Sequence, residues 1–443
     1  MHILLHGLNY WPEELGIGKY SGEMVQFLAQ KGHDVTVVTT PPYYPQWKVW
    51  NGYRGSWYRS YNETSPKDGN GKVQVIRCPL WVPKKVSGLK RIIHLASFAV
   101  SSISPVLWNC LRHRPDVVMT VEPAAFCMPT TWLGAKLGGA TAWLHVQDFE
   151  VDAAFELGIL KQRWMKRLVL AIESFWMRRF DKVSSISPNM VAKLNSKNVD
   201  KDRTWLFPNW VDCNEMYPLN DTQGLRSEFG LPEGKCIALY AGNIGAKQGL
   251  DLIIEAARSS TSNPDLHYVI CGTGARVQHF KHLAGDLPNL HWLDPQPFEV
   301  FNRLMNCADI HLLPQKGGAA DLVMPSKLTG MLATGRPVVA GADAGTQLAK
   351  VVDGLGVVVP AGDSDAFAAA IQKLANQPEA RQKMGQAARD YAVQFLGRES
   401  ILSQFEQQLV ELCSDEVPKR AEISSHSSMK PQSQTHQTQE VTK

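Results

Sequence analysis

Short apolar runs alternate with amphipathic helical periods along most of this chain, and this alternation restricts the possible fold more than any other feature. Near the N-terminus, residues 2–8 read as a strand, residues 18–32 as an amphipathic helix and residues 33–40 as a second strand. Strands connected through helices run parallel, and uninterrupted apolar runs suit a sheet covered on both faces. The sequence therefore predicts an α/β fold.

The alternation occurs in two successive series. Further strands are expected in the first series at residues 73–78, 115–121, 141–148 and 182–187, and in the second at residues 236–243, 266–272, 290–294, 309–314 and 336–341. A chain of 443 residues also exceeds what one core usually organises. We therefore expect two Rossmann-like, doubly wound lobes that face a cleft, with ligands beyond the carboxyl ends of the strands.

The expected division of the chain follows from these series. Residues 1–210 would form an N-terminal acceptor-binding lobe and residues 211–395 a C-terminal lobe that binds a nucleotide sugar, joined by a turn-rich linker at residues 208–224. A helix at residues 396–413 would pack on the first lobe. Residues 414–443 are rich in Ser, Gln and Thr and poor in large apolar residues, so we expect a disordered tail there.

Composition excludes some classes of function. The net charge of +4 is too mild to make nucleic acid the expected partner. The 8 cysteines are scattered without metal-ligand spacing, so we expect reduced thiols and no metal site. The N-terminus lacks the features of a signal peptide, and residues 92–108, the most apolar helical window, are interrupted by His94 and Pro105. We therefore expect a cytoplasmic protein with peripheral membrane contact at most.

Two glycine-bearing loops are candidates for holding an anion. In the stretch YAGNIGAKQG, a strand end precedes Gly242, Asn243 and Lys247, and a helix begins near Leu250, so backbone N–H groups and one ammonium could hold a diphosphate. A tight turn with a solvated lysine is the alternative. The stretch GIGKYSG places Gly16 and Gly18 just before a helix, where a backbone could approach a ligand or simply form a flexible loop.

Three further stretches add candidate site residues. Gly272 lies in a GTG turn after a strand, although that signal is weak and a structural turn is favoured. The stretch DLVMPSKLTG places Asp321, Ser326 and Lys327 at the mouth of a helix, a natural seat for phosphate oxygens. His145 ends a strand, where it could contact a sugar hydroxyl or transfer a proton, or could be a satisfied core histidine.

Basic residues alternate with large apolar ones in two segments of the first lobe. This pattern suits an interfacial helix on anionic headgroups, and an ordinary surface helix is the alternative. The candidate membrane and acceptor residues are Lys84, Lys85, Lys90, Arg91, Arg163, Lys166 and Arg167.

The order of the motifs resembles that of the GT-B glycosyltransferases of glycosyltransferase family four. The resemblance rests on the glycine-bearing first loop, KGHDVTVVTT, FPNWVD, GNIGAKQG, GTG and ATGRPVV, and it covers about residues 1–410. Each motif is weak alone, whereas six in the right order are specific. GIGKYSGEM, PPYYPQW and MPSKLTGMLATG are similar to enzymes of exopolysaccharide assembly of the colanic acid type.

The resemblance implies transfer of a sugar, with retention of anomeric configuration, from a GDP- or UDP-linked donor to a lipid-linked oligosaccharide at the inner face of the cytoplasmic membrane. It implies that Ser326 and Lys327 hold the donor diphosphate with Lys247 opposite and that no cofactor is needed. With His145 from its strand-end position, the catalytic candidates are His145, Asp321 and Lys247. The family usually has two glutamates eight positions apart where this chain has Leu322 and Gly330. A non-catalytic sugar-nucleotide-binding subunit and a sugar-nucleotide epimerase are therefore the competing interpretations.

Overall fold

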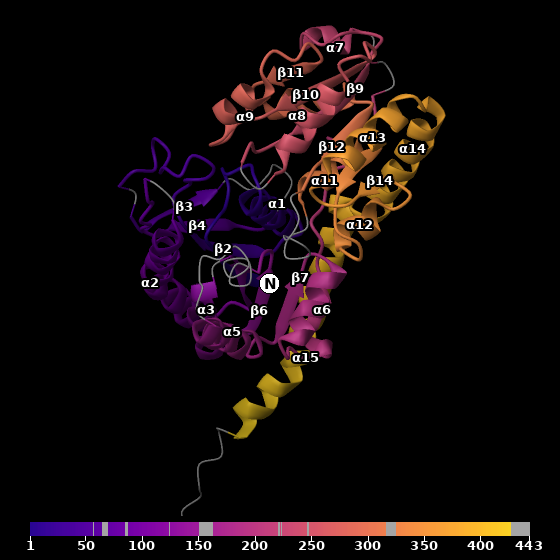
Figure 1. Ribbon diagram of the computed structural model, residues 1–443. Coiled ribbons are helices and arrows are strands. Elements are labelled where there is room, and N and C mark those ends of the chain that lie inside the picture. Colours follow the sequence, from indigo (N-terminus) through magenta and orange to yellow (C-terminus); the bar gives the residue numbers. More distant parts are fainter. Residues whose placement is uncertain are drawn as a thin grey trace, which may run out of the picture.

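The computed structural model describes residues 1–55, 57–63, 70–84, 87–123, 125–149, 163–219, 222, 224–245, 248–315 and 325–426. It contains two sheets, each covered by helices on both faces, as Figure 1 shows. The prediction of an α/β fold with two doubly wound lobes is confirmed.

The N-terminal sheet has the strand order β3 (Arg59–Glu63), β4 (Val73–Arg77), β2 (Asp34–Thr39), β1 (His2–Gly7), β5 (Val117–Glu122), β6 (Thr141–Val146), β7 (Lys182–Ser185) and β8 (Thr204–Leu206). All neighbours pair in parallel except β3, which is antiparallel to β4. The apolar runs alternate between the two faces of the sheet, because successive side chains of a strand point to opposite sides.

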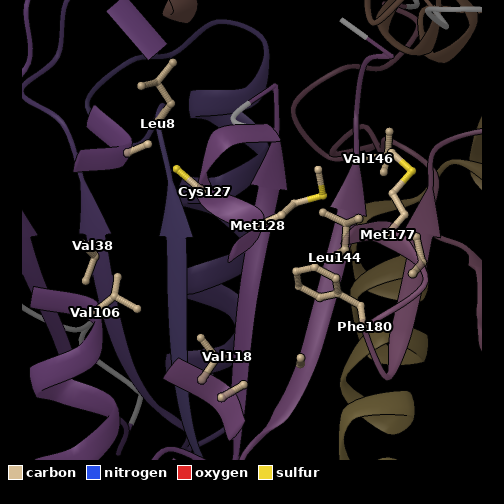
Figure 2. Close-up of a cluster of buried hydrophobic side chains, with 14 of the residues drawn as sticks. Leu8, Val38, Val106, Val118, Cys127, Met128, Leu144, Val146, Met177 and Phe180 are labelled. Atoms are coloured by element: carbon tan, nitrogen blue, oxygen red, sulfur yellow. The ribbon is translucent and has the colours of Figure 1, made fainter. Parts of the chain in front are cut away.

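One face of this sheet packs on α2 (Gly88–His113), α3 (Met128–Gly138), α5 (Arg163–Met177) and α6 (Pro188–Ser196). Figure 2 shows part of that core, in which Val118 and Leu144 of the strands lie among Val106, Met128 and Phe180. The other face packs on α1 (Ile17–Gln30) and on α15 (Arg398–His426), which returns from the second lobe. The helix α15 continues to His426, past the position at which we expected a disordered tail to begin.

The C-terminal sheet is wholly parallel, with the order β11 (Leu290–Leu293), β10 (Leu266–Cys271), β9 (Cys236–Ala241), β12 (Ile310–Leu313), β13 (Val338–Gly341) and β14 (Gly356–Val359). One face packs on α10 (Phe298–Asn306), α11 (Lys327–Ala333), α12 (Gln347–Val352) and α14 (Pro378–Phe395). The other packs on α8 (Leu250–Ser259), α9 (Val277–Ala284) and α13 (Ser364–Ala375), while α7 (Leu225–Glu228) precedes β9.

The chain passes between the lobes twice, and the two crossings are bonded to each other. Val211 N donates to Leu396 O at 2.8 Å, and Arg398 N donates to Val211 O at 3.0 Å. The guanidinium of Arg398 also forms an ion pair with Asp212 at 3.0 Å. The two lobes are therefore connected by a pair of bonded segments rather than by one free linker.

Candidate functional site

Lys327 is the first residue of α11, and its side chain crosses the carboxyl end of β9. Its Nζ donates a hydrogen bond to Tyr240 Oη at 2.5 Å and lies 4.2 Å from the centroid of the Tyr240 ring. Burial lowers the pKa of this ammonium to about 8, and no carboxylate of the described residues offsets the shift. The site therefore holds a partly desolvated cation that is hydrogen-bonded to a phenol.

Tyr240 connects this cation to the loop after β9. Its hydroxyl accepts from Lys327 and donates to Asn243 O at 2.6 Å. Burial raises the pKa of the Tyr240 hydroxyl, so Tyr240 remains a neutral donor and acceptor. The chain of hydrogen bonds thus fixes the position of the Asn243 backbone relative to Lys327.

Gly242 makes this approach possible, because a side chain there would collide with Lys327. A Cβ on Gly242 would lie 2.4 Å from Lys327 Cε, and its φ is +144°. The N–H of Gly242 donates to Cys271 O at 2.9 Å, and the N–H of Gly272 donates to Leu293 O at 3.1 Å. These two amides are thus used within the protein, and the glycines serve close packing rather than amide donation to a ligand.

The loop before α1 is the facing element of the N-terminal lobe. Gly16 precedes the helix with a φ of 56°, and a Cβ on Gly18 would lie 2.7 Å from Glu13 O. The buried Glu13 carboxylate accepts from the backbone N–H groups of Tyr43 and Tyr44 at 2.7 and 2.8 Å. Burial raises the pKa of Glu13, and these donors oppose that rise. Glu13 therefore fastens this loop to the one after β2.

The first turn of α1 touches the helices of the other lobe. The Tyr20 hydroxyl lies close to the side chain of Thr329 in α11, and Lys19 Nζ lies 5.9 Å from the centroid of the Phe298 ring in α10. Thr329 follows Lys327 by two positions. The structure therefore brings the loop with Gly16 and Gly18 to the helix that carries Lys327.

His145 is placed differently. It is buried in β6, its Nδ1 lies 2.9 Å from Ser184 Oγ, and its Nε2 lies 3.0 Å from Gln147 Nε2. Its ring packs on Phe207, and burial lowers the pKa of His145 to about 3. Both ring nitrogens have partners in the core, so the geometry is that of a satisfied core histidine and gives no support to a proton-transfer role.

The remaining candidates divide into two groups. Lys247, Asp321, Leu322 and Lys85 lie outside the described residues. Ser326 is exposed at the start of α11 and makes no capping hydrogen bond through its side chain, whereas Gly330 lies inside that helix. Within the part of the chain that the structure describes, no three His, Cys, Asp or Glu residues are grouped in a way that could hold a metal ion.

The basic candidates lie on the opposite face of the N-terminal sheet from α1. Lys84, Lys90, Lys166 and Arg167 are exposed, and the Arg91 guanidinium lies 5.8 Å from the centroid of the Trp47 ring. The backbone of Arg163 opens α5, while its side chain lies outside the described residues. The structure thus separates this group from Lys327.

Sequence reasoning missed Tyr240 and the contact between Tyr20 and Thr329. Tyr240 lies two residues before Gly242, the glycine that follows β9, so its place next to the candidate loop could have been noted from the sequence. The contact between Tyr20 and Thr329 joins residues 309 positions apart on different lobes. No local sequence pattern predicts this contact.

Both lobes match known families. The Glycosyl transferase 4-like domain matches residues 16–210, and Glycosyl transferases group 1 matches residues 221–391. Among solved structures, sucrose-phosphate synthase from Thermosynechococcus elongatus superposes with a TM-score of 0.72 at 17% identity, covering 94% of this chain and 99% of that one. Anabaena Alr3699/HepE in complex with UDP gives 0.67 at 14% identity, covering 93% and 100%. The fold and these matches define a GT-B glycosyltransferase.

The sequence is also 41% identical over 416 residues to the colanic acid biosynthesis glycosyl transferase WcaI of Escherichia coli (strain K12), covering 91% of this chain and 98% of that protein. The chain belongs to the glycosyltransferase family that includes WcaI.

Proposed function

We propose that this glycosyltransferase moves a hexose, with retention, from a nucleotide diphosphate sugar to a lipid-linked oligosaccharide during exopolysaccharide assembly of the colanic acid type. The similarity to WcaI supports the biosynthetic role, and the fold shared with a UDP complex of HepE supports the class of donor. With this acceptor, sugar transfer takes place at the cytoplasmic face of the inner membrane. No cofactor is part of the proposal.

The observation that carries the proposal is the partly buried ammonium of Lys327 at the meeting of the two lobes, which has no carboxylate partner among the described residues. When the glycosidic bond of the donor breaks, negative charge develops on the departing diphosphate. A fixed cation in a site shielded from water stabilises that charge more than it stabilises the bound substrate. Lys327 is thus the phosphate-binding and catalytic group, while Lys247 and Asp321 remain expected partners.

The first prediction concerns the charge of Lys327. The Lys327→Met variant keeps the unbranched stem and loses the ammonium, so transfer is expected to fall about 100- to 1,000-fold, the usual effect of removing one electrostatic stabiliser. Release of nucleoside diphosphate measures the rate. The apo protein is expected to unfold at the same or a higher temperature, because a desolvated charge has been removed.

Lys235→Met is the matched control, because Lys235 precedes β9 at the other end of the same strand and pairs with Asp265 at 2.7 Å. Its turnover is expected to stay within twofold of the unmodified protein. Equal turnover in the Lys327 and Lys235 variants would remove Lys327 from the mechanism.

Absence of the usual glutamate at Gly330 favours a second candidate function, a binding subunit that holds a sugar nucleotide without transferring it. Donor panels with and without a membrane lipid acceptor separate the two. Nucleotide binding by thermal shift without acceptor-dependent diphosphate release would support the binding subunit.

A further inference from the structure

The outward faces of three helices in the N-terminal lobe expose large apolar side chains at helical spacing. In α2, Val100 is 70% exposed and Trp108 is 66% exposed. Other exposed apolar residues repeat with them along α2, α3 and α5: Leu89, Ile93, Ile103, Leu111, Leu133, Leu137, Trp164, Leu168, Ile172 and Phe175. Apolar stripes of this length on adjacent helices exceed the scattered exposed residues of an ordinary surface.

The three stripes belong to one surface, because the helices pack against one another. A Cβ on Gly134 of α3 would lie 2.9 Å from Cys110 Sγ of α2, so these two helices are in close contact. Trp132 of α3 meets Trp176 of α5 with ring centroids 6.0 Å apart. Figure 1 shows α2, α3 and α5 next to one another at the lower left, away from the C-terminal lobe.

The charge of these helices is strongly one-sided. Lysines and arginines number three in α2, one in α3 and three in α5, whereas Glu173 is their one acidic residue. Glu173 is 3% exposed and forms an ion pair with Lys197. The whole chain, by contrast, has 46 basic and 42 acidic residues. A partner that is both apolar and anionic would match these two properties of the surface.

The inner side of α2 shows how the helix meets that partner. Within the described part of the chain, α2 is the one helix long and apolar enough to cross a membrane. However, Ser102 Oγ lies 2.8 Å from His6 Nε2 of β1, and Phe98 and Val106 are fully buried in the core. A spanning orientation would break this core, so α2 in this fold does not cross a membrane.

We propose that the outward faces of α2, α3 and α5 together form one docking surface for a bilayer of anionic phospholipid, the three-helix face. The apolar side chains enter the acyl boundary, the exposed Lys90, Lys166 and Arg167 meet the headgroups, and Trp108 and Trp164 lie at the interface. The partner rests on the proposed function, because a lipid-linked acceptor requires membrane contact. The inference that this surface is a docking site rests on its exposed apolar side chains and its basic charge.

A second copy of the chain is the other occupant that an apolar face could take. Self-association would bring basic residues against basic residues with no exposed acid on these helices to compensate, and like charges across an interface oppose association. A negatively charged membrane satisfies both properties of the surface. The two occupants predict different results when vesicles are added and when protein concentration is raised.

The test is flotation of the purified full chain with vesicles of phosphatidylcholine alone or with about 30% phosphatidylglycerol, whose anionic headgroups attract basic segments. The variants are Val100→Glu with Trp108→Glu on α2, and Leu168→Glu with Ile172→Glu on α5. Each pair is expected to reduce co-flotation with anionic vesicles at least about fivefold, and all four changes to abolish it. Val393→Glu, an exposed apolar site on α14, is the control and should float normally.

Light scattering after gel filtration tests the second occupant. A concentration-dependent dimer that the α2 pair dissociates, together with no vesicle binding, would overturn the proposal. Equal flotation of all the variants and the unmodified chain would also overturn the proposal.

Transfer to a detergent-solubilised acceptor separates this inference from the proposed function. Normal transfer with lost flotation is expected in the four-residue variant. Strong flotation of a protein that releases no nucleoside diphosphate would contradict the proposed function and leave the three-helix face standing. Transfer without any flotation of the unmodified chain would contradict the three-helix face alone.

Discussion

The ammonium of Lys327 is held in an unfavourable state until an anion arrives. Its partners are the hydroxyl and ring of Tyr240, which stabilise a positive charge less than bulk water does. In the folded protein the pKa of Lys327 is about 8, below the ordinary lysine pKa of 10.5. Between these pH values the unfolded chain binds more protons, so this group makes the apo protein more stable as pH rises through that window.

A bound anion favours the charged form of Lys327, so nucleotide affinity is predicted to depend on pH. A diphosphate beside Lys327 raises its pKa, so binding of UDP or GDP near pH 8 to 9 is expected to take up a fraction of a proton that grows with pH. Affinity should fall by up to about tenfold per pH unit above 8. Calorimetry in buffers of different ionisation enthalpy measures the uptake. Binding to the Lys327→Met variant that still takes up the proton would assign it to another group.

At the residue scale, sequence patterns singled out Lys327 and the glycine loops as candidates because special backbone positions leave local signals. They did not identify the role of each glycine, since the amide partners of Gly242 and Gly272 lie on neighbouring strands. His145 shows a second gap. Its position at a strand end suits a site, whereas its burial between Ser184 and Phe207 follows from the packing of several strands.

Among the elements, α2 was expected as a buried or interfacial helix, and it runs from Gly88 to His113 with Pro105 inside it. A proline removes one N–H, which leaves the carbonyl four residues earlier without its helical donor. That carbonyl is Ser101 O, and Tyr58 Oη donates to it at 3.1 Å. A donor from a distant loop thus replaces the missing bond, which no analysis of the helix alone could reveal.

Three strands were missed, β3, β8 and β14, and each lies at an edge of its sheet. The β3 sequence RSYNE is polar and has no buried residue, because it lies at the edge of the sheet. The other two edge strands are short, 3 residues in β8 (TWL) and 4 in β14 (GVVV). Long apolar runs identified the central strands, whereas edge strands and very short strands lack that signal.

A paired substitution tests helix packing. Gly330 in α11 has Met216 Cε at 3.7 Å from an added Cβ, so Gly330→Ala is expected to raise the free energy of unfolding by about 0.5 to 1 kcal/mol. Gly385 in α14 has Gly335 O at 2.3 Å, so Gly385→Ala should lower it. Denaturant titration measures both. Destabilisation by Gly330→Ala would mean that α11 cannot accept a side chain there.

For the whole molecule, the order of strands and helices was sufficient to predict two lobes, since each series repeats one structural unit. The contacts that join the lobes lie beyond such reasoning. Buried histidines provide a global property that the sequence also hides: His6, His145 and His311 are enclosed in both lobes, and burial lowers the pKa of each to about 3.

Acid is therefore expected to destabilise both lobes. The unfolded histidines bind protons below pH 6.5 and the folded ones do not, so stability is lost as pH falls from 6.5, by up to about 1.4 kcal/mol per pH unit for each histidine. Urea midpoints between pH 7 and 5.5 measure the slope. His311→Gln should reduce it, whereas His279→Gln, an exposed site, should not. An unchanged slope in His311→Gln would count against this cause.

The return of α15 to the first lobe has a consequence for biosynthesis. Ile401, Leu402, Phe405 and Leu409 complete the core beneath β1, β5 and β6, yet the ribosome makes them after the entire second lobe. While the polypeptide is still emerging, Trp143 and Phe207 lack the ring of Phe405 against which they pack. The N-terminal lobe is therefore translated first but completes its hydrophobic core last. Premature termination anywhere before residue 409 leaves this core incomplete.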